Sequence, residues 1–167
     1  MVTAVAARAW DVAAATPDPE LPMVTLADLG ILRDVEERDG GVVVTITPTY
    51  SGCPAMREIA HDLRHRLQTA GYAEVRVEHR LAPAWTTDWI TADGRAKLAA
   101  GGIAPPSAAP VRTGPIPLTL APVRRAVACP RCGSGDTHET SVFSGTACKA
   151  LYRCGSCAEP FEYVKEI

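Results

Sequence analysis

Two close pairs of cysteines near the C-terminal end constrain this chain more than any other feature. Cys129 and Cys132 form one CxxC pair, Cys154 and Cys157 form the other, and 21 residues separate the pairs. Two such turns bring four thiolates into a tetrahedron, each about 2.3 Å from a Zn²⁺ ion. A module of about 40 residues buries too little surface to fold without such a metal. Residues 123–167 are therefore predicted to form a zinc ribbon of short antiparallel strands.

The charge of this module limits the partners that we expect for it. From residue 123 onward there are six Lys and Arg against five Asp and Glu, a formal balance of +1. Four thiolates on one Zn²⁺ add about two negative charges, so the metallated module is near −1. Nucleic-acid binding needs clustered positive charge, which this sequence does not provide. We expect no nucleic-acid partner, and a ribbon that serves as a structural staple or a docking surface.

Three further ligating side chains are ambiguous. Cys148 precedes Cys154 by six residues. It is either a small buried side chain of a ribbon strand, or an exchangeable ligand or redox thiol. His61 and His65 have HxxxH spacing, but Asp and Arg residues surround them in the sequence. We expect both histidines on a solvated helix face.

The apolar segments and the cysteine usage indicate a cytoplasmic protein. No run of 18 or more apolar residues is present, so no membrane span is expected. The alanine-rich N-terminal segment lacks a basic region before its apolar part and contains Arg8 and Asp11, which argues against a signal peptide. The six cysteines indicate metal ligands rather than disulfides.

The first 100 residues are predicted to form a small α+β domain. Apolar spacing indicates helices over residues 2–15 and 54–70, and one or two short helices within residues 86–102. Alternating patterns indicate strands over residues 29–37, 42–47 and 73–81. This order predicts helices on one face of a three-stranded sheet. Residues 101–122 contain six of the 14 prolines and are expected to be an extended linker to the ribbon.

A single thiol, Cys53, lies in the turn TPTYSGCPAM before the second predicted helix. Pro54 suits a first helical turn, which would place Cys53 at or near the N-cap. There the helix dipole and the free N–H groups favour an anionic sulfur. The hydroxyls of Thr47 and Thr49 lie nearby in the sequence. A cysteine in such a turn is poorly placed to fill a core.

Asp18 and Glu20 lie in the segment PDPELP, where prolines restrict the backbone. Two arrangements are open: the acids cap a turn or face water, or one or both lie beside Cys53. A carboxylate next to a thiolate is unfavourable, but a bound cation favours both anions together. The second arrangement would therefore suit metal handling better than nucleophilic catalysis.

Several motifs resemble known families. DPELP…TLADLGI followed by VTITPTYSGCPAM is similar to the small domain shared by SufT-type proteins of iron–sulfur cluster maturation. LAPAWTTDWIT, GIAPP, the CPRC…CGSC ribbon and CKALYRC…EPFEY together resemble the PaaD proteins of phenylacetate catabolism, over nearly the whole chain. The resemblance implies four zinc ligands in the ribbon and a transient metal or cluster site at Asp18, Glu20 and Cys53, with Thr47 and Thr49 as supporting hydroxyls.

The resemblance also implies a role. Such a protein is needed for a functional phenylacetyl-CoA ring-epoxidase, a multicomponent oxygenase with a di-iron subunit and a reductase that carries an iron–sulfur cluster and flavin. The implied role is maturation rather than catalysis, with the oxygenase and reductase subunits or iron–sulfur assembly proteins as partners. Because one thiol does not complete a cluster site, the client or a second protomer of a homodimer would supply further ligands. Two alternatives stay open: a non-catalytic docking subunit with no metal at Cys53, and an enzyme that uses Cys53 as a nucleophile.

Overall fold

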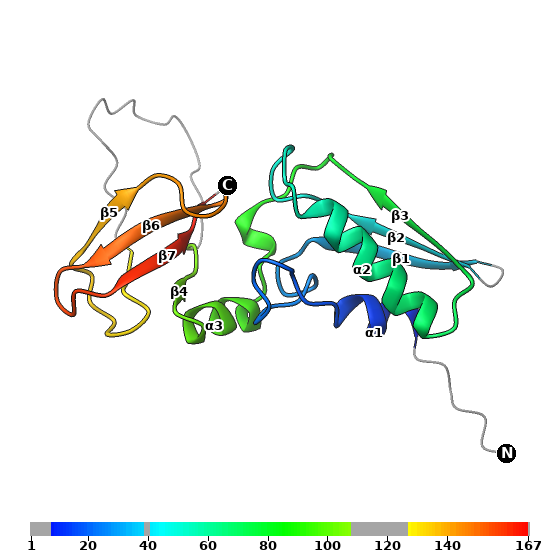
Figure 1. Ribbon diagram of the computed structural model, residues 1–167, viewed down its shortest axis with the longest axis horizontal. Coiled ribbons are helices and arrows are strands. Elements are labelled where there is room, and N and C mark those ends of the chain that lie inside the picture. Colours follow the sequence, from blue (N-terminus) through cyan, green and yellow to red (C-terminus); the bar gives the residue numbers. More distant parts are fainter. Residues whose placement is uncertain (1–7, 39–40, 108–126, 167) are drawn as a thin grey trace, which may run out of the picture. The chain divides into compact units, whose positions relative to one another are not determined.

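The structure is a computed structural model that describes residues 8–38, 41–107 and 127–166. The chain divides into two compact units, Met1–Lys97 and Leu98–Ile167. Each unit contains its own β-sheet (Figure 1). Among the residues that are described, no helix has the length and apolar character to span a bilayer.

The first unit is a three-stranded sheet in the order β1-β2-β3, with two helices on one face (Figure 1). β1 pairs antiparallel with β2, whereas β2 pairs in parallel with β3, so the second helix is the crossover between parallel strands. The elements are α1 (Ala9–Ala14), β1 (Leu32–Arg38), β2 (Gly41–Ile46), α2 (Met56–Thr69) and β3 (Glu74–His79). The predicted α+β class and the predicted element order are confirmed.

The helix α2 follows directly from its sequence pattern. Its buried side chains recur at helical spacing and form the stripe that packs on the sheet: Met56, Ile59, Ala60, Leu63 and Leu67. The helix ends in a Schellman motif, in which the Tyr72 N–H donates to the Leu67 carbonyl and the Gly71 N–H donates to the Gln68 carbonyl. Gly71 has a φ of +106°, which an L side chain rarely adopts.

Two elements begin later than predicted. Arg8 is extended, so α1 begins at Ala9, and residues 2–7 of the predicted helix lie outside the described residues. β1 begins at Leu32 rather than at Leu29, because Gly30 has a left-handed φ of +68° within a turn.

Residues 85–97 complete the first unit. The Trp85 indole N–H donates to the Leu29 carbonyl over 2.9 Å, and the Arg33 guanidinium lies 3.6 Å from the ring centre of Trp89. Gly30 approaches Trp89 so closely that a Cβ on Gly30 would lie 2.5 Å from the Trp89 Cβ. The two short helices expected here are η1 (Thr87–Trp89) and α3 (Ala92–Ala100), and the boundary between the units falls within α3.

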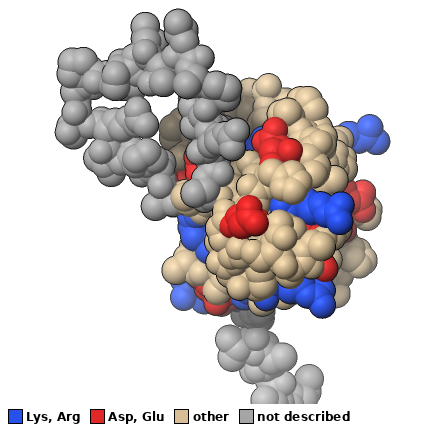
Figure 2. All heavy atoms as spheres, turned by 90° about the vertical axis from the view of Figure 1, so that its left-hand side faces the viewer, with Lys and Arg blue, Asp and Glu red and all other residues tan. Residues whose placement is uncertain are grey.

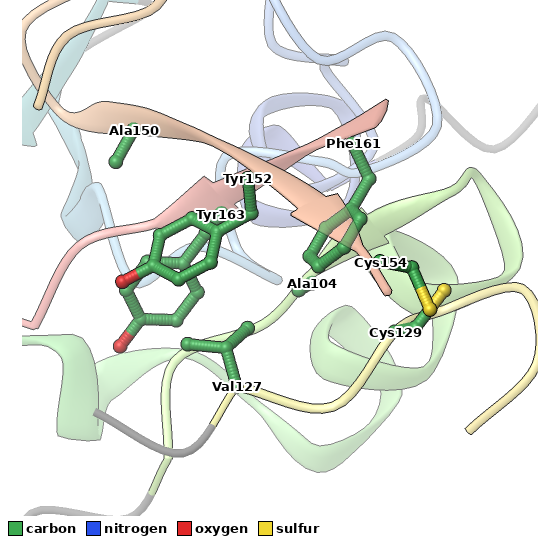
Figure 3. Packing of buried hydrophobic residues seen from close by; sticks show 8 residues of the cluster. All are labelled: Ala104, Val127, Cys129, Ala150, Tyr152, Cys154, Phe161 and Tyr163. Carbon is green, nitrogen blue, oxygen red and sulfur yellow. The ribbon is translucent and has the colours of Figure 1, made fainter. Parts of the chain in front are cut away.

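The second unit is a four-stranded sheet in the order β4-β7-β6-β5. Its strands are β4 (Ile103–Ala104), β5 (Thr137–Ser141), β6 (Lys149–Cys154) and β7 (Pro160–Val164). The ring of Tyr152 stacks with the ring of Phe161 and meets the ring of Tyr163 edge-on. Figure 3 shows the Tyr152 and Tyr163 rings side by side, with Phe161 toward the cysteines of the same cluster. The predicted zinc ribbon of short strands is confirmed.

The linker prediction is wrong at its beginning. Ile103 and Ala104 are buried and pair in parallel with β7 at Glu162 and Tyr163, so they belong to the ribbon sheet. The isoleucine and the alanine supply apolar surface that the sheet covers, despite the prolines that follow them. Residues 108–122 of the predicted linker lie outside the described residues.

Candidate metal centres

The four ribbon cysteines converge on one point. Their sulfur atoms all lie within 4.8 Å of one another. The Sγ atoms of Cys129 and Cys157 are 3.8 Å apart, and those of Cys132 and Cys154 are 3.6 Å apart. Four sulfurs placed tetrahedrally at about 2.3 Å from an ion would be about 3.8 Å apart. The arrangement therefore fits a four-coordinate metal ion.

The electrostatics of the cysteines explain why an ion is needed. The backbone N–H of Cys157 donates to the Cys154 sulfur over 3.4 Å, and this bond is the main reason that the Cys154 pKa is lowered to about 7. A backbone hydrogen bond at Ser134 lowers the pKa of Cys132, but the Cys157 thiol and the other neighbours raise it overall to about 12. Four adjacent sulfurs cannot all ionise without a cation, and a bound dication removes that obstacle.

Polar contacts between the two cysteine turns hold the site in place. The Ser134 and Ser156 hydroxyl oxygens are 2.7 Å apart, and the Gly155 N–H donates to the Asp136 carbonyl over 2.7 Å.

The four ribbon cysteines differ in their exposure to solvent. Cys129 and Cys154 are 2% and 1% exposed and face the hydrophobic core, whereas Cys132 and Cys157 are exposed.

The fifth ribbon cysteine, Cys148, is half-buried and directly precedes β6. Its sulfur lies 3.1 Å from the Thr146 hydroxyl, and its carbonyl accepts a hydrogen bond from the Lys165 N–H. Cys148 does not belong to the group of four ligating sulfurs. Both interpretations of this thiol, packing or exchange, remain predictions.

Figure 2 shows one face of the molecule, on which Lys and Arg side chains alternate with Asp and Glu side chains. The contacts of the ribbon show the same mixing of signs. Arg131 pairs with Glu159 at 3.0 Å, and the buried Lys149 pairs with Glu162 at 2.8 Å. Such pairs neutralise charge locally and do not build the positive patch that phosphate backbones require.

Cys53 lies close to the beginning of α2 but not at its cap. The N-cap is Ala55 and the first helical residue is Met56, so Pro54 precedes the cap instead of opening the first turn. Cys53 was expected at or near the N-cap, and it lies two residues before it. Cys53 is half-buried, and its N–H donates to the Tyr50 carbonyl over 3.1 Å, which closes the loop that follows β2.

Asp18 is 6% exposed, and one of its carboxylate oxygens caps the PDPELP turn. The Oδ1 atom accepts from the N–H groups of Glu20 and Leu21, both over 2.9 Å. This contact is the turn-capping arrangement that the sequence left open, and it fixes the carboxylate relative to the backbone. Glu20 is half-buried.

A run of backbone hydrogen bonds brings the Asp18 turn and the Cys53 loop to the same end of the sheet. The Leu26 N–H donates to the Thr16 carbonyl, the Ile31 N–H donates to the Leu26 carbonyl, and the Thr47 N–H donates to the Ile31 carbonyl, each over 2.9 Å. Figure 1 shows both loops at the end of the sheet where β2 terminates. Thr47 is 1% exposed, and its hydroxyl has no hydrogen-bond partner among the described residues.

Within the described part of the chain, two groups of three or more ligating side chains have all donor atoms within 4.8 Å. One is the ribbon cysteine group. The other is Glu58, His61 and Asp62 on α2. This group was not predicted from the HxxxH spacing of the two histidines. Its signal in the sequence is the spacing of three ligands at i, i+3 and i+4. Asp18, Glu20 and Cys53 do not form such a group.

Two protein families match this chain. The family described as iron–sulfur cluster assembly protein matches residues 14–78, and the PaaD zinc beta ribbon domain matches residues 115–165. Residues 79–114, which contain η1, α3 and β4, lie outside both matches.

Individual relatives extend these matches. The chain is 45% identical over 156 residues to an Escherichia coli protein named as a subunit of 1,2-phenylacetyl-CoA epoxidase, covering 93% of this chain and 90% of that protein. It is 34% identical over 83 residues to an Fe-S protein maturation auxiliary factor of Porphyromonas gingivalis, covering 48% of this chain and 78% of that protein.

A solved structure agrees with the first unit. The crystal structure of a domain of unknown function, DUF59, from Bacillus anthracis superposes with a TM-score of 0.50 at 28% identity, covering 54% of this chain and 87% of that one. The fold, the four-cysteine centre and the match along almost the entire Escherichia coli relative point to one conclusion. The chain belongs to the PaaD family, with a domain of the iron–sulfur cluster assembly family followed by a PaaD zinc ribbon.

Proposed function

We propose that this protein is a cytoplasmic maturation factor of the phenylacetyl-CoA ring-epoxidase system that assists assembly of iron or an iron–sulfur cluster and performs no catalysis itself. The observation that carries the proposal is the union of an iron–sulfur cluster assembly domain and a PaaD ribbon in one chain. A relative that aligns across both parts is named as a subunit of that epoxidase, and one that aligns with about half the chain is named as an Fe-S maturation factor.

The cargo would be held at the end of the first sheet. Cys53 would supply a thiolate, and Asp18 or Glu20 would supply a carboxylate oxygen after a local rearrangement. The buried Thr47 hydroxyl supports a polar ligand in this region, since an unpaired buried hydroxyl costs about 1–3 kcal/mol. Because this ligand set is incomplete, a client protein or a second protomer would add ligands and take over the cargo.

The ribbon would hold a structural Zn²⁺ through Cys129, Cys132, Cys154 and Cys157. Four thiolates without an open coordination position suit a closed structural site. The metal would then fix the ribbon as a rigid surface for docking to the oxygenase or reductase subunits. In this arrangement the two units have separate tasks, which are cargo handling and client recognition.

Anaerobic reconstitution of the zinc-loaded, full-length protein with Fe²⁺ and sulfide tests the proposal. Wild type, Cys53→Ala and Cys148→Ala are compared by iron and zinc analysis; Cys148 is a matched control because it is also half-buried and also lies outside the ribbon ligand group. We expect wild type and Cys148→Ala to take up iron and Cys53→Ala to lose it, with about one zinc per chain in all three.

Three results would contradict the proposal. Equal iron uptake by wild type and Cys53→Ala would show that Cys53 is not a ligand of the cargo. If the epoxidase subunits purified from cells that contain Cys53→Ala also had full iron content, the docking-subunit alternative would replace maturation. Equal iron loss in Cys53→Ala and Cys148→Ala would instead indicate non-specific binding by thiols.

A further inference from the structure

The exposed face of α2 carries three ligating side chains that the proposed function does not use. Donor atoms of Glu58, His61 and Asp62 all lie within 4.8 Å of one another, and the His61 Nδ1 is 3.7 Å from an Asp62 carboxylate oxygen. Glu58 and His61 are exposed, and Asp62 is half-buried. The group therefore combines two carboxylates and one imidazole at the surface.

Helix geometry holds this group together. Residues three and four apart on a helix are neighbours on the same face, so Glu58 lies beside both His61 and Asp62. The opposite face of α2 is anchored in the core through Ile59 and Leu63, which are 1% and 0% exposed. The three ligands therefore project from a backbone that is already fixed, and binding of an ion would order only their side chains.

The donor set indicates the class of ion. Imidazole and carboxylate oxygens together suit first-row divalent cations such as Mn²⁺ and Fe²⁺. Three side chains leave further coordination positions for water. Arg57 lines the same surface hollow as Pro54, Glu58 and His61, so its charge offsets part of the attraction of the two carboxylates. A weak and rapidly exchanging site follows from this balance.

We propose that Glu58, His61 and Asp62 form an exchangeable surface site for a first-row divalent cation. The site is distinct from the ribbon cysteines and from Cys53. It lies beside the Cys53 loop, because Pro54 follows Cys53 directly and lines the same hollow. The site does not depend on the proposed cargo role, since none of its ligands belongs to the cargo site.

Titration of the full-length, zinc-loaded protein with Mn²⁺ tests the site, with free Mn²⁺ measured by electron paramagnetic resonance. Mn²⁺ is the suitable probe because carboxylate and imidazole bind it, whereas thiolates prefer softer ions. We expect one saturable site in wild type that is weakened about tenfold or more by His61→Ala or Asp62→Asn. His65→Ala is the matched control, because this exposed histidine is one turn away and outside the group.

Three outcomes would overturn the site. The first is a wild-type protein without saturable Mn²⁺ binding. The second is an equal loss in His65→Ala and His61→Ala, which would assign binding to the histidine pair. The third is loss of Mn²⁺ in Cys53→Ser with full binding in His61→Ala, which would move the ion to the cargo site. Intact Mn²⁺ binding together with failed iron uptake at Cys53 would contradict the proposed function and leave this site standing.

Discussion

Gly30→Ala should destabilise the first unit far more than an alanine at another left-handed glycine. At Gly30 the φ of +68° costs an L residue about 1–2 kcal/mol. The new Cβ would also lie 2.5 Å from the Trp89 Cβ and 2.7 Å from the Trp89 carbonyl oxygen, and relieving such overpacking costs about 1–3 kcal/mol more. We therefore expect a loss of about 2–5 kcal/mol in the free energy of unfolding.

Gly71→Ala is the control for the backbone conformation, and the difference between the two variants gives the cost of the close contact with Trp89. Gly71 has a φ of +106°, but a Cβ there would meet no atom within 4 Å. Both substitutions restrict the unfolded chain equally, so that effect cancels in the difference between them. We expect Gly71→Ala to cost about 1–2 kcal/mol.

Urea unfolding, monitored by tryptophan fluorescence, measures the difference in unfolding free energy between the two variants for the first unit. All three tryptophans, Trp10, Trp85 and Trp89, lie within Met1–Lys97, so the ribbon does not contribute to the signal. The transition midpoint should fall with little change in its slope. If Gly30→Ala is no less stable than Gly71→Ala, the close packing of Trp89 on Gly30 is refuted.

Two further predictions concern the metal and the pH. Cys129→Ser should reduce the zinc content from about one per chain to near zero and leave the tryptophan transition unchanged, whereas Cys148→Ser should keep the metal; elemental analysis with fluorescence checks both. Burial raises the pKa of Asp28, but the Thr25 N–H and the Lys97 ammonium outweigh it and hold the pKa below 3.8. Because this folded-state pKa is depressed, the contribution of Asp28 is present above pH 3.8 and is lost as the pH falls through the folded pKa. Asp28→Asn should therefore lower the free energy of unfolding by about 1–2 kcal/mol at pH 7, and a difference that persists unchanged well below that pKa would contradict this.

Local patterns were sufficient for much of the fold. The apolar stripe of α2 and its glycine stop are periodic signals within one segment, and the structure reproduces them at Met56–Thr69. The CxxC spacing likewise predicts the four-sulfur centre, because each turn is local and the chemistry of the ion demands their convergence.

Contacts between distant segments could not be predicted in the same way. The pairing of β4 with β7 joins residues more than 50 positions apart, and the prolines after Ala104 concealed the strand. The Lys97 ammonium reaches the Asp28 carboxylate over 2.9 Å across 69 positions of sequence. Where α2 begins depends on backbone geometry, and the residue types at Cys53 and Pro54 did not determine that it begins at Met56. The sequence likewise did not determine whether Asp18 caps its turn, because this too depends on the backbone conformation.

The unequal exposure of the ribbon sulfurs sets the order in which they should release a bound metal ion. Judged from the described residues, a chelator or a foreign thiol would reach a bound ion past the exposed Cys132 and Cys157, because Cys129 and Cys154 are buried against the core. Release should therefore proceed in order, with the outer sulfurs leaving first and the inner sulfurs keeping the ion longest. Alkylation during chelation should label the outer two before the inner two, and recapture of the ion would begin from the two sulfurs that the fold keeps in place.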